Sequence, residues 1–273
     1  MTNFPQTPGS HYRPAGLRER LERALALLAP AGQALEPGQL GALDQFHTRG
    51  LAATRELAEL GGIVAGHAVL DVGSGLGGPA RLVAASRGCR VIGIDLSEEF
   101  VEAARYLSER TGQTAQVEFL HASALALPFG DAVFDRILLQ HVAMNIRQRT
   151  ELYREMRRVL VPGGRMAAYD VVRAGGEPLY PLPWARSPEH SFLLDAAATR
   201  DAVEAAGLRT LAWRDDTPAA IGWAQRLLQA VGAPPAPGLA VAMGEDFPQL
   251  AANLARSLLQ GRVGVLMAVF EAA

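Results

Sequence analysis

A glycine-rich turn between a short apolar run and a helical pattern most constrains the fold of this chain. The stretch "VLDVGSGLGG" covers residues 69–78, and Gly73, Gly75 and Gly78 have the spacing G-x-G-x-x-G. Such a turn lets a ligand approach the main chain closely at the amino end of the following helix. Asp95 closes the next apolar run, "RVIGID", where a carboxylate can accept hydrogen bonds from both hydroxyls of a ribose. The sequence therefore predicts a cofactor that contains adenosine.

Asp71, two residues before the first glycine, separates two classes of cofactor. A turn that binds a diphosphate gains from the positive end of its helix, and a carboxylate beside it would repel the phosphates. S-adenosylmethionine has no phosphate and carries two cationic groups, so an acid suits it by direct attraction or by ordering the turn. The rival cofactor, NAD(P), is supported only by the glycine spacing and Asp95. Helix or loop capping is the structural alternative for both acids, with Ser97 a competing cap in "SEEFVEAA".

Short apolar runs alternate with helical patterns from residue 68 onward. The runs are "AVLDVG", "RVIGID", "VEFLHA", "FDRILLQ" and "GRMAAYDVV", with helical stretches near 78–87, 97–111 and 147–160 and a Pro-Gly turn in "LVPGGRM". Beyond residue 172 come a helix near 198–206, a strand "RTLAWRD", a helical insertion over about 218–260 and a last strand "VGVLMAVFE". This alternation is typical of βαβ units, so we expect an α/β fold with a doubly wound, mostly parallel sheet.

Two helical patterns, over 17–28 and 40–60, precede the first strand. We expect residues 1–66 to form an N-terminal helical segment that covers the site. Residues 67–273 would form the cofactor-binding domain, with the insertion before its last strand.

The charge and composition exclude several other classes of function. A formal net charge of -2 with no long basic run disfavours a nucleic-acid partner. The single cysteine, Cys89, excludes an internal disulfide, and no apolar window approaches the ~20 residues of a membrane span. No signal peptide is evident, so we predict a cytoplasmic protein without a membrane partner. We also predict a monomer or a homodimer. Its histidines do not have the spacing of a metal site.

Four blocks together resemble the class I S-adenosylmethionine-dependent methyltransferases, in particular the small-molecule branch with the ubiquinone/menaquinone C-methyltransferases and the sarcosine/dimethylglycine N-methyltransferases. The blocks are "VLDVGSGLGGPARLVA", "VIGIDLSEEFVEAA", "ALALPFGDAVFDRILLQHV" and "YREMRRVLVPGGRM". The resemblance covers roughly residues 40–215. It implies a Rossmann-like, seven-stranded sheet whose last strand is antiparallel, with S-adenosylmethionine across the carboxyl ends of the first strands.

The resemblance also implies roles for residues that would bind the cofactor. Gly73, Ser74 and Gly75 would contact its methionine part and ribose, Asp95 the diol and Leu96 the adenine, while Gln140 would offer its carbonyl to the ammonium group. Relatives usually have Gly-Asp-Ala where this chain has Ala122-Ser123-Ala124. The hydroxyl of Ser123, with the backbone amide of Ala124, would then bond the adenine amine more weakly than a carboxylate does.

Three residues are candidates for catalysis. His47 in "LDQFHTRG" lies on or near a helix, in a polar cluster that resembles a family segment folded over the cofactor; a helix-terminal histidine is the alternative. His141 follows Gln140 at the carboxyl end of a strand, where sites in such sheets gather. Tyr169 or its neighbour Asp170 would point into the pocket, because adjacent strand residues alternate. Such a residue is needed only where the acceptor arrives protonated.

The acceptor pocket would be lined by Met144 and Asn145 after the fourth strand and by Tyr180 and Trp184 in the Pro-rich loop "RAGGEPLYPLPWARSP". Tyr12 is a further candidate for an aromatic lid. We expect methyl transfer from S-adenosylmethionine to a small molecule, at nitrogen, oxygen or carbon, with an amine or phenol favoured. The alternatives are a catalytically silent S-adenosylmethionine-binding protein and an NAD(P)-dependent oxidoreductase.

Overall fold

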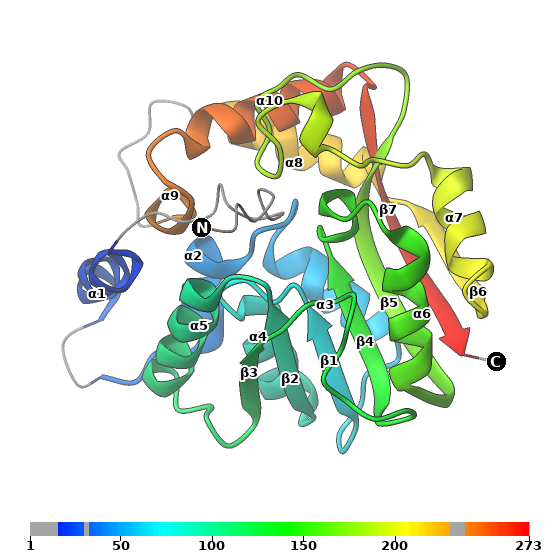
Figure 1. The fold of residues 1–273 in the computed structure, drawn as a ribbon. Helices are drawn as coiled ribbons and strands as arrows, with labels where there is room; N and C mark the ends of the chain where they lie inside the picture. Colours follow the sequence, from blue (N-terminus) through cyan, green and yellow to red (C-terminus); the bar gives the residue numbers. More distant parts are fainter. Residues whose placement is uncertain (1–15, 30–32, 230–237, 273) are drawn as a thin grey trace, which may run out of the picture.

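A seven-stranded sheet forms the centre of the protein (Figure 1). The computed structural model describes residues 16–29, 33–229 and 238–272. The strands are β1 (Ala68–Val72), β2 (Arg90–Asp95), β3 (Val117–His121), β4 (Phe134–Gln140), β5 (Leu160–Arg173), β6 (Leu208–Asp215) and β7 (Val263–Ala272). Their order is β3-β2-β1-β4-β5-β7-β6, and β7 runs antiparallel to both of its neighbours. The predicted sheet, including its antiparallel last strand, is confirmed.

Helices cover both faces of this sheet. They are α1 (Leu17–Leu28), α2 (Gly41–Asp44), α3 (Leu51–Leu60), α4 (Gly78–Arg87), α5 (Glu98–Arg110), α6 (Arg149–Val159), α7 (Ala196–Glu204), α8 (Thr217–Gln229), α9 (Ala240–Met243) and α10 (Phe247–Leu259), with 3-10 turns η1 (Pro37–Leu40), η2 (Ala143–Asn145) and η3 (Pro188–His190). Buried side chains of α3, α4, α5, α8 and α10 share one apolar core with the sheet, and those of α6 and α7 share another. Figure 1 shows α8, α9 and α10 above the edge where the parallel strands end.

The pattern over 40–60 is interrupted, so the single helix predicted there is wrong. The chain leaves α2 after Asp44 and enters α3 at Leu51, with residues 45–50 between them in a loop. Arg49 and Gly50 have φ angles of 63° and 48°, which no α-helix contains. The polar side chains of this loop bond to α3, β4 and β5, and a continuous helix could not direct them there.

The stretch "LVPGG" is also not a simple turn. It continues β5, with Gly163 at φ 72°, and a register shift against β4 lies between the pairs Phe134–Leu160 and Arg136–Arg165. The proline and glycines therefore form an irregularity at the start of a strand.

Within the described ranges, no helix has the length and apolar character needed to cross a membrane. Nor does this part of the chain bring together three or more His, Cys, Asp or Glu residues that could hold a metal ion.

Candidate functional site

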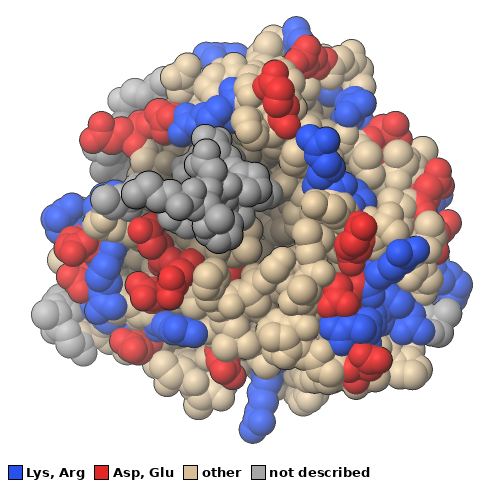
Figure 2. All heavy atoms as spheres, viewed as in Figure 1, with Lys and Arg blue, Asp and Glu red and all other residues tan. Residues whose placement is uncertain are grey.

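A cavity of about 590 Å³ lies at the carboxyl ends of β1, β2 and β4. The strand order reverses between β1 and β4, and ligands of open α/β sheets bind at such a point. Twelve predicted site residues line it: His47, Gly73, Gly75, Asp95, Leu96, Ser123, Ala124, Gln140, His141, Met144, Asn145 and Trp184. Figure 2 shows uncharged residues around a hollow on this face, with acidic and basic side chains interspersed farther out.

The glycines of the turn serve two different purposes. Gly73 and Gly75 line the cavity with φ angles of 69° and 54°, and a Cβ on Gly73 would collide with Val142. Gly78 instead faces the N-terminal segment, because a Cβ there would collide with the backbone and carboxylate of Asp44. Only the first two glycines of the motif therefore open the backbone toward a ligand.

Asp95 organises the turn from the end of β2. Its carboxylate accepts hydrogen bonds from the backbone N–H groups of Gly75 and Ser97, both at 2.9 Å, and burial raises its pKa. The cap of α5 is Ser97, whose hydroxyl accepts from the N–H of Phe100 at 3.3 Å. Since a carboxylate can accept about four hydrogen bonds, Asp95 keeps acceptor capacity for a diol at the cavity.

Asp71 lies beneath the turn and does not line the cavity. It is 2% exposed, and its carboxylate accepts a hydrogen bond from the backbone N–H of Ala80 in the first turn of α4. Burial, together with the nearby charge of Asp95, raises the pKa of Asp71 to about 7. Much of its charge is therefore absent at neutral pH. This geometry favours ordering of the turn over direct attraction of a cationic ligand.

The remaining predicted cofactor residues surround this turn. Leu96, Ser123 and Ala124 line the cavity after β2 and β3. The Ser123 hydroxyl accepts from the N–H of Leu125 at 3.2 Å. Ser74 is buried, and its backbone N–H donates to Ile94 at 2.9 Å. We name the cavity lining formed by Gly73, Gly75, Asp95, Leu96, Ser123 and Ala124 the turn end.

The turn end fits an adenosine ligand without phosphates. Within the described chain, no Lys or Arg lines the cavity, and Asp95 is its only carboxylate. A diphosphate would find no cationic side chain there. The buried side-chain atoms Ser74 Oγ and Gln140 Oε1 have no hydrogen-bond partner among the described residues. Such orphaned polar atoms beside a pocket are consistent with polar groups supplied by a ligand.

His47 lies in the loop between α2 and α3, where it contacts three polar groups. Its Nε2 is 3.1 Å from the carbonyl oxygen of Gly50, 3.0 Å from the hydroxyl of Thr54 and 3.2 Å from Nε2 of Gln140. A backbone carbonyl can only accept, so the contact with Gly50 places a proton on this nitrogen. Burial lowers the pKa of His47 to about 4, which leaves its ring neutral at neutral pH.

His141 lies directly after β4, with a strained backbone at φ 54°. Its N–H donates to the carbonyl of Tyr169 at 2.8 Å, and the two rings stack with centroids 5.3 Å apart. Nε2 of His141 is 3.3 Å from the Thr48 hydroxyl, which is 2.9 Å from the hydroxyl of Tyr169. Burial, with a smaller effect of His47, lowers the pKa of His141 well below its usual value.

The structure thus brings the three candidates for catalysis together. The His47 ring centroid is 6.0 Å from that of His141 and 5.9 Å from that of Tyr169. Both histidines line the cavity, whereas Tyr169 lies behind them and its pKa is raised by burial. Asp170 also does not line it, and accepts from the N–H of Ala143 at 3.1 Å. We name His47, Thr48, Thr54, Gln140, His141 and Tyr169 the histidine cluster.

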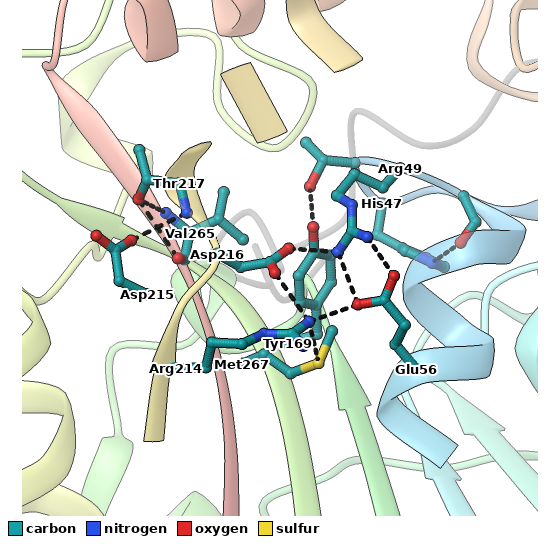
Figure 3. A network of polar contacts seen from close by, with 12 residues as sticks. His47, Arg49, Glu56, Tyr169, Arg214, Asp215, Asp216, Thr217, Val265 and Met267 are labelled. Carbon is teal, nitrogen blue, oxygen red and sulfur yellow. Dashed lines mark hydrogen bonds and ion pairs between the residues drawn. The ribbon is translucent and has the colours of Figure 1, made fainter. Parts of the chain in front are cut away.

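Sequence reasoning placed Thr48 in the polar cluster around His47 but gave it no role, and it missed two charged residues next to the histidine cluster, Arg49 and Asp216. Figure 3 shows Arg49 and Asp216 beside the ring of Tyr169, and Arg49 donates to Asp216 at 2.6 Å. Thr48 and Arg49 stood in the segment "QFHTRG", where their polarity was a usable signal. No signal in the sequence pointed to Asp216, because it lies between β6 and α8, far along the chain from the segment at 45–50.

Another part of the cavity lining is apolar. We name it the apolar wall; it consists of Met144, Pro183, Trp184, Trp223, Leu227, Leu239, Met243, Phe247, Ala251 and Leu254, and the polar residues Asn145 and Gln148 also line the cavity. Trp184 is buried, and its Nε1 donates to the hydroxyl of Ser191 at 3.0 Å. Tyr180 packs against the core and does not line the cavity. Tyr12 lies outside the described residues.

Comparison with known families decides the class of this site. The family model described as a methyltransferase domain matches residues 70–168, from β1 into β5. Residues 70–168 are therefore similar to a methyltransferase domain. This domain class uses S-adenosylmethionine, in agreement with the turn end.

Individual proteins and solved structures are also similar to this chain. Methyltransferase GfsG of Streptomyces halstedii is 39% identical over 133 residues, which are 49% of this chain and 48% of that protein. The chain thus spans about half the length of this curated relative. Two solved structures share the fold: a geranyl diphosphate methyltransferase in complex with S-adenosylmethionine (TM-score 0.66, 19% identity, 91% and 95% of the chains) and the [4+2]-cyclase SpnF (0.63, 24%, 81% and 80%).

Proposed function

We propose that the protein transfers a methyl group from S-adenosylmethionine to a neutral, largely apolar small molecule. The observation that carries this proposal is the cavity's division into a turn end with one carboxylate, Asp95, and an apolar wall without a charged side chain in the described residues. When bound, S-adenosylmethionine supplies a methyl carbon that an acceptor atom attacks while the carbon–sulfur bond breaks, its electron pair remaining on sulfur. The chain's task is to bind, to align the acceptor and to exclude water.

The apolar wall narrows the class of acceptor. A phosphorylated substrate would need Lys or Arg, and a protonated amine held only by aromatic faces would leave its charge without a carboxylate. Asp95 belongs to the turn end, and the wall contributes mainly aliphatic and aromatic surface. The lining therefore supports a hydroxylated or unsaturated apolar acceptor better than the amine favoured from the sequence.

Two segments outside the matched domain contribute to the cavity lining. Phe46, His47 and Thr48 come from the N-terminal helical segment 1–66, and Trp223 and Phe247 come from the insertion at about 218–260. We propose that the N-terminal segment and this insertion, which lies within the domain at 67–273, together determine which acceptor is bound. A cytoplasmic location, the absence of a nucleic-acid or membrane partner, and a monomeric or homodimeric state stay predictions.

Calorimetry and a product assay test the function. We expect S-adenosylhomocysteine to bind, NAD to give no heat, and labelled methyl to pass from S-adenosylmethionine to a member of a panel of sterols, terpenols and macrolactones. Transfer to amines alone would contradict the proposed acceptor class, and binding of NAD without S-adenosylhomocysteine would contradict the proposed cofactor.

A catalytically silent binding protein is the second candidate. The observation that favours it is that SpnF, named as a cyclase, shares the fold, so the fold alone does not decide the reaction. Tight S-adenosylhomocysteine binding without methyl transfer to any member of a broad acceptor panel would support this candidate. Formation of S-adenosylhomocysteine with any acceptor would exclude it.

A further inference from the structure

The histidine cluster contains a continuous set of polar contacts that leads away from the cavity. Nε2 of His141 is 3.3 Å from the hydroxyl of Thr48, and this hydroxyl is 2.9 Å from that of Tyr169. We propose that the two hydroxyl groups of Thr48 and Tyr169 fix the protonation of His141, so that Nδ1 of this ring takes a proton from the acceptor. The inference rests on the proposed function and adds which atom accepts the proton.

The contacts end on a buried carboxylate, that of Asp216. Asp216 is 3% exposed, and its carboxylate contacts the Tyr169 hydroxyl and favours the protonated phenol. It accepts from Arg49 at 2.6 Å and pairs with Arg214 at 2.9 Å, and both arginines also pair with Glu56 (Figure 3). These four side chains pair two carboxylates with two guanidinium groups, so the Asp216 oxygens act as hydrogen-bond acceptors beside Tyr169.

The carboxylate of Asp216, paired with Arg49 and Arg214, sets the direction of the hydrogen bonds. A carboxylate only accepts, so the Tyr169 hydroxyl donates to Asp216 and its oxygen is free to accept from Thr48. The Thr48 oxygen then accepts from His141, which places the ring proton on Nε2. The lone pair is left on Nδ1, for which no hydrogen bond is found in the described part of the chain.

His47 differs from His141 in this respect. Its Nε2 contacts the Gly50 carbonyl, Thr54 and Gln140, and no carboxylate is among these partners. An imidazolium formed at His141 would be stabilised through the two hydroxyls by the carboxylate of Asp216, whereas one formed at His47 would not. His141 is therefore the proton acceptor of the pair.

The strained backbone of His141 supports the same assignment. A non-glycine residue at φ 54° is held there only where the surrounding structure compensates for the cost, and such residues cluster at functional sites. Here the stacked Tyr169 ring and the bond from the His141 N–H to the Tyr169 carbonyl hold the imidazole at the cavity wall.

The proton balance of the step follows. As the acceptor oxygen forms its bond to the methyl carbon, its O–H bond breaks and the proton passes to Nδ1 of His141. The imidazolium keeps the proton on Nε2, which is hydrogen-bonded to the Thr48 hydroxyl. After the product leaves, it releases the proton on Nδ1 to water. His141 is the catalytic residue, while Thr48 and Tyr169 are positioning residues because they act through it.

Nitrogen NMR of the protein labelled with ¹⁵N at histidine, without added ligand, tests the inference directly. We expect His141 near pH 7 to carry its proton on Nε2, with signals assigned by comparison with His141→Asn. A proton on Nδ1 in the wild-type protein would overturn the proposal, and this reading requires no folded variant of Thr48 or Tyr169.

Two conservative substitutions extend the test. Thr48→Val removes the acceptor for Nε2, so we expect loss of the single tautomer and its recovery in Thr48→Ser. Tyr169→Phe keeps the stacked ring and removes the link to Asp216, so we expect a mixture of tautomers. Tyr153→Phe is the matched control, since Tyr153 is also buried but bonds to Arg149 and does not line the cavity.

The outcomes separate the two proposals. An unchanged His141 tautomer in both Thr48→Val and Tyr169→Phe, with these variants still binding S-adenosylhomocysteine, would overturn the hydroxyl chain and leave the methyltransferase function standing. If the wild-type protein did not bind S-adenosylhomocysteine, the proposed function would instead be overturned, whichever tautomer His141 adopts.

Discussion

The turn end and the histidine cluster of the cavity are built in opposite ways. The turn end comes from three short stretches, 73–75, 95–96 and 123–124, which lie at or just beyond the carboxyl ends of β1, β2 and β3. The histidine cluster draws on the loop at 45–50, α3, β4 and β5, and its neighbour Asp216 follows β6. A nucleoside site can thus be assembled by local backbone, whereas a proton-accepting site needs side chains that only the folded chain brings together.

The turn end and the histidine cluster therefore differ in how they tolerate substitutions. The turn end depends on glycine conformations and backbone N–H groups, which tolerate few substitutions. The histidine cluster depends on side chains from separate segments, which can be changed one at a time. We therefore expect substitutions to affect cofactor affinity and methyl transfer separately, except where a residue joins the two regions.

Arg81 ties the turn to α2, which leads into the loop of His47 and Thr48, and its loss should have the largest effect. It is 0% exposed, pairs with Asp44 at 2.8 Å and donates to the carbonyl of Leu76 in the turn at 2.6 Å. Arg81→Met should lower the free energy of unfolding by about 3–5 kcal/mol, because it leaves a buried carboxyl group without its partner. Urea denaturation measures this. Arg209→Met, at an exposed pair with Glu271, should cost less than about 1 kcal/mol.

A similar loss in both arginine variants would show that the N-terminal segment is not anchored beneath the turn through Arg81. In that case the turn end and the histidine cluster would not depend on a common buried ion pair.

Asp71→Asn should change the pH dependence of stability. The pKa of Asp71 rises from 3.8 to about 7 in the folded protein, so its contribution to stability is complete below pH 3.8 and is lost as the pH rises through about 7. The unfolding free energy of the wild type relative to the variant should therefore fall by up to about 4 kcal/mol over that range.

Denaturation of both proteins at several pH values gives this difference. The pKa of Asp170 is also raised to about 7, but Asp170 is present in both and its contribution cancels. A difference that is constant with pH, or one that grows as the pH rises, would contradict a buried and largely protonated Asp71.

His141→Asn should affect only methyl transfer. We expect the rate to fall by about 100-fold, the typical contribution of general base catalysis, while the Kd for S-adenosylhomocysteine changes by less than about twofold. Steady-state kinetics with an acceptor from the panel, together with calorimetry, measures both quantities. His190→Asn on η3, outside the cavity lining, is the control. Equal loss of binding and turnover would argue against separate regions.

Asp95→Asn should affect only the turn end. Loss of the charge-assisted hydrogen bonds to the diol should raise the Kd for S-adenosylhomocysteine by about 10- to 100-fold. The His141 tautomer should stay as in the wild type. Calorimetry and NMR provide the two readings, and Asp131→Asn, whose side chain is 78% exposed, should change neither. A shifted tautomer in Asp95→Asn would show that the regions are coupled.

The sequence predicted the fold and the turn end with few errors, because both depend on local patterns. Strand residues such as those of "RVIGID" and the glycine turn determine their conformations with little help from distant residues. The break between α2 and α3 was missed although residues 45–50 are mostly polar, since they leave the helix only to reach partners on other elements.

Asp71 shows a second limit. The sequence placed a carboxylate beside the turn and assumed its charge, but burial and the proximity of Asp95 leave that carboxyl largely protonated near neutral pH. Whether an acid is charged depends on its surroundings, which the residue type does not report.

What the sequence by itself determined is the sheet, the glycine turn and the acid at the end of β2, because short-range periodicity and backbone freedom dictate them. What only the tertiary structure decided is that Thr48, His141, Tyr169 and Asp216 meet. Their separation along the chain leaves no periodic signal, and the contacts arise only when the loop at 45–50 packs onto the end of β5.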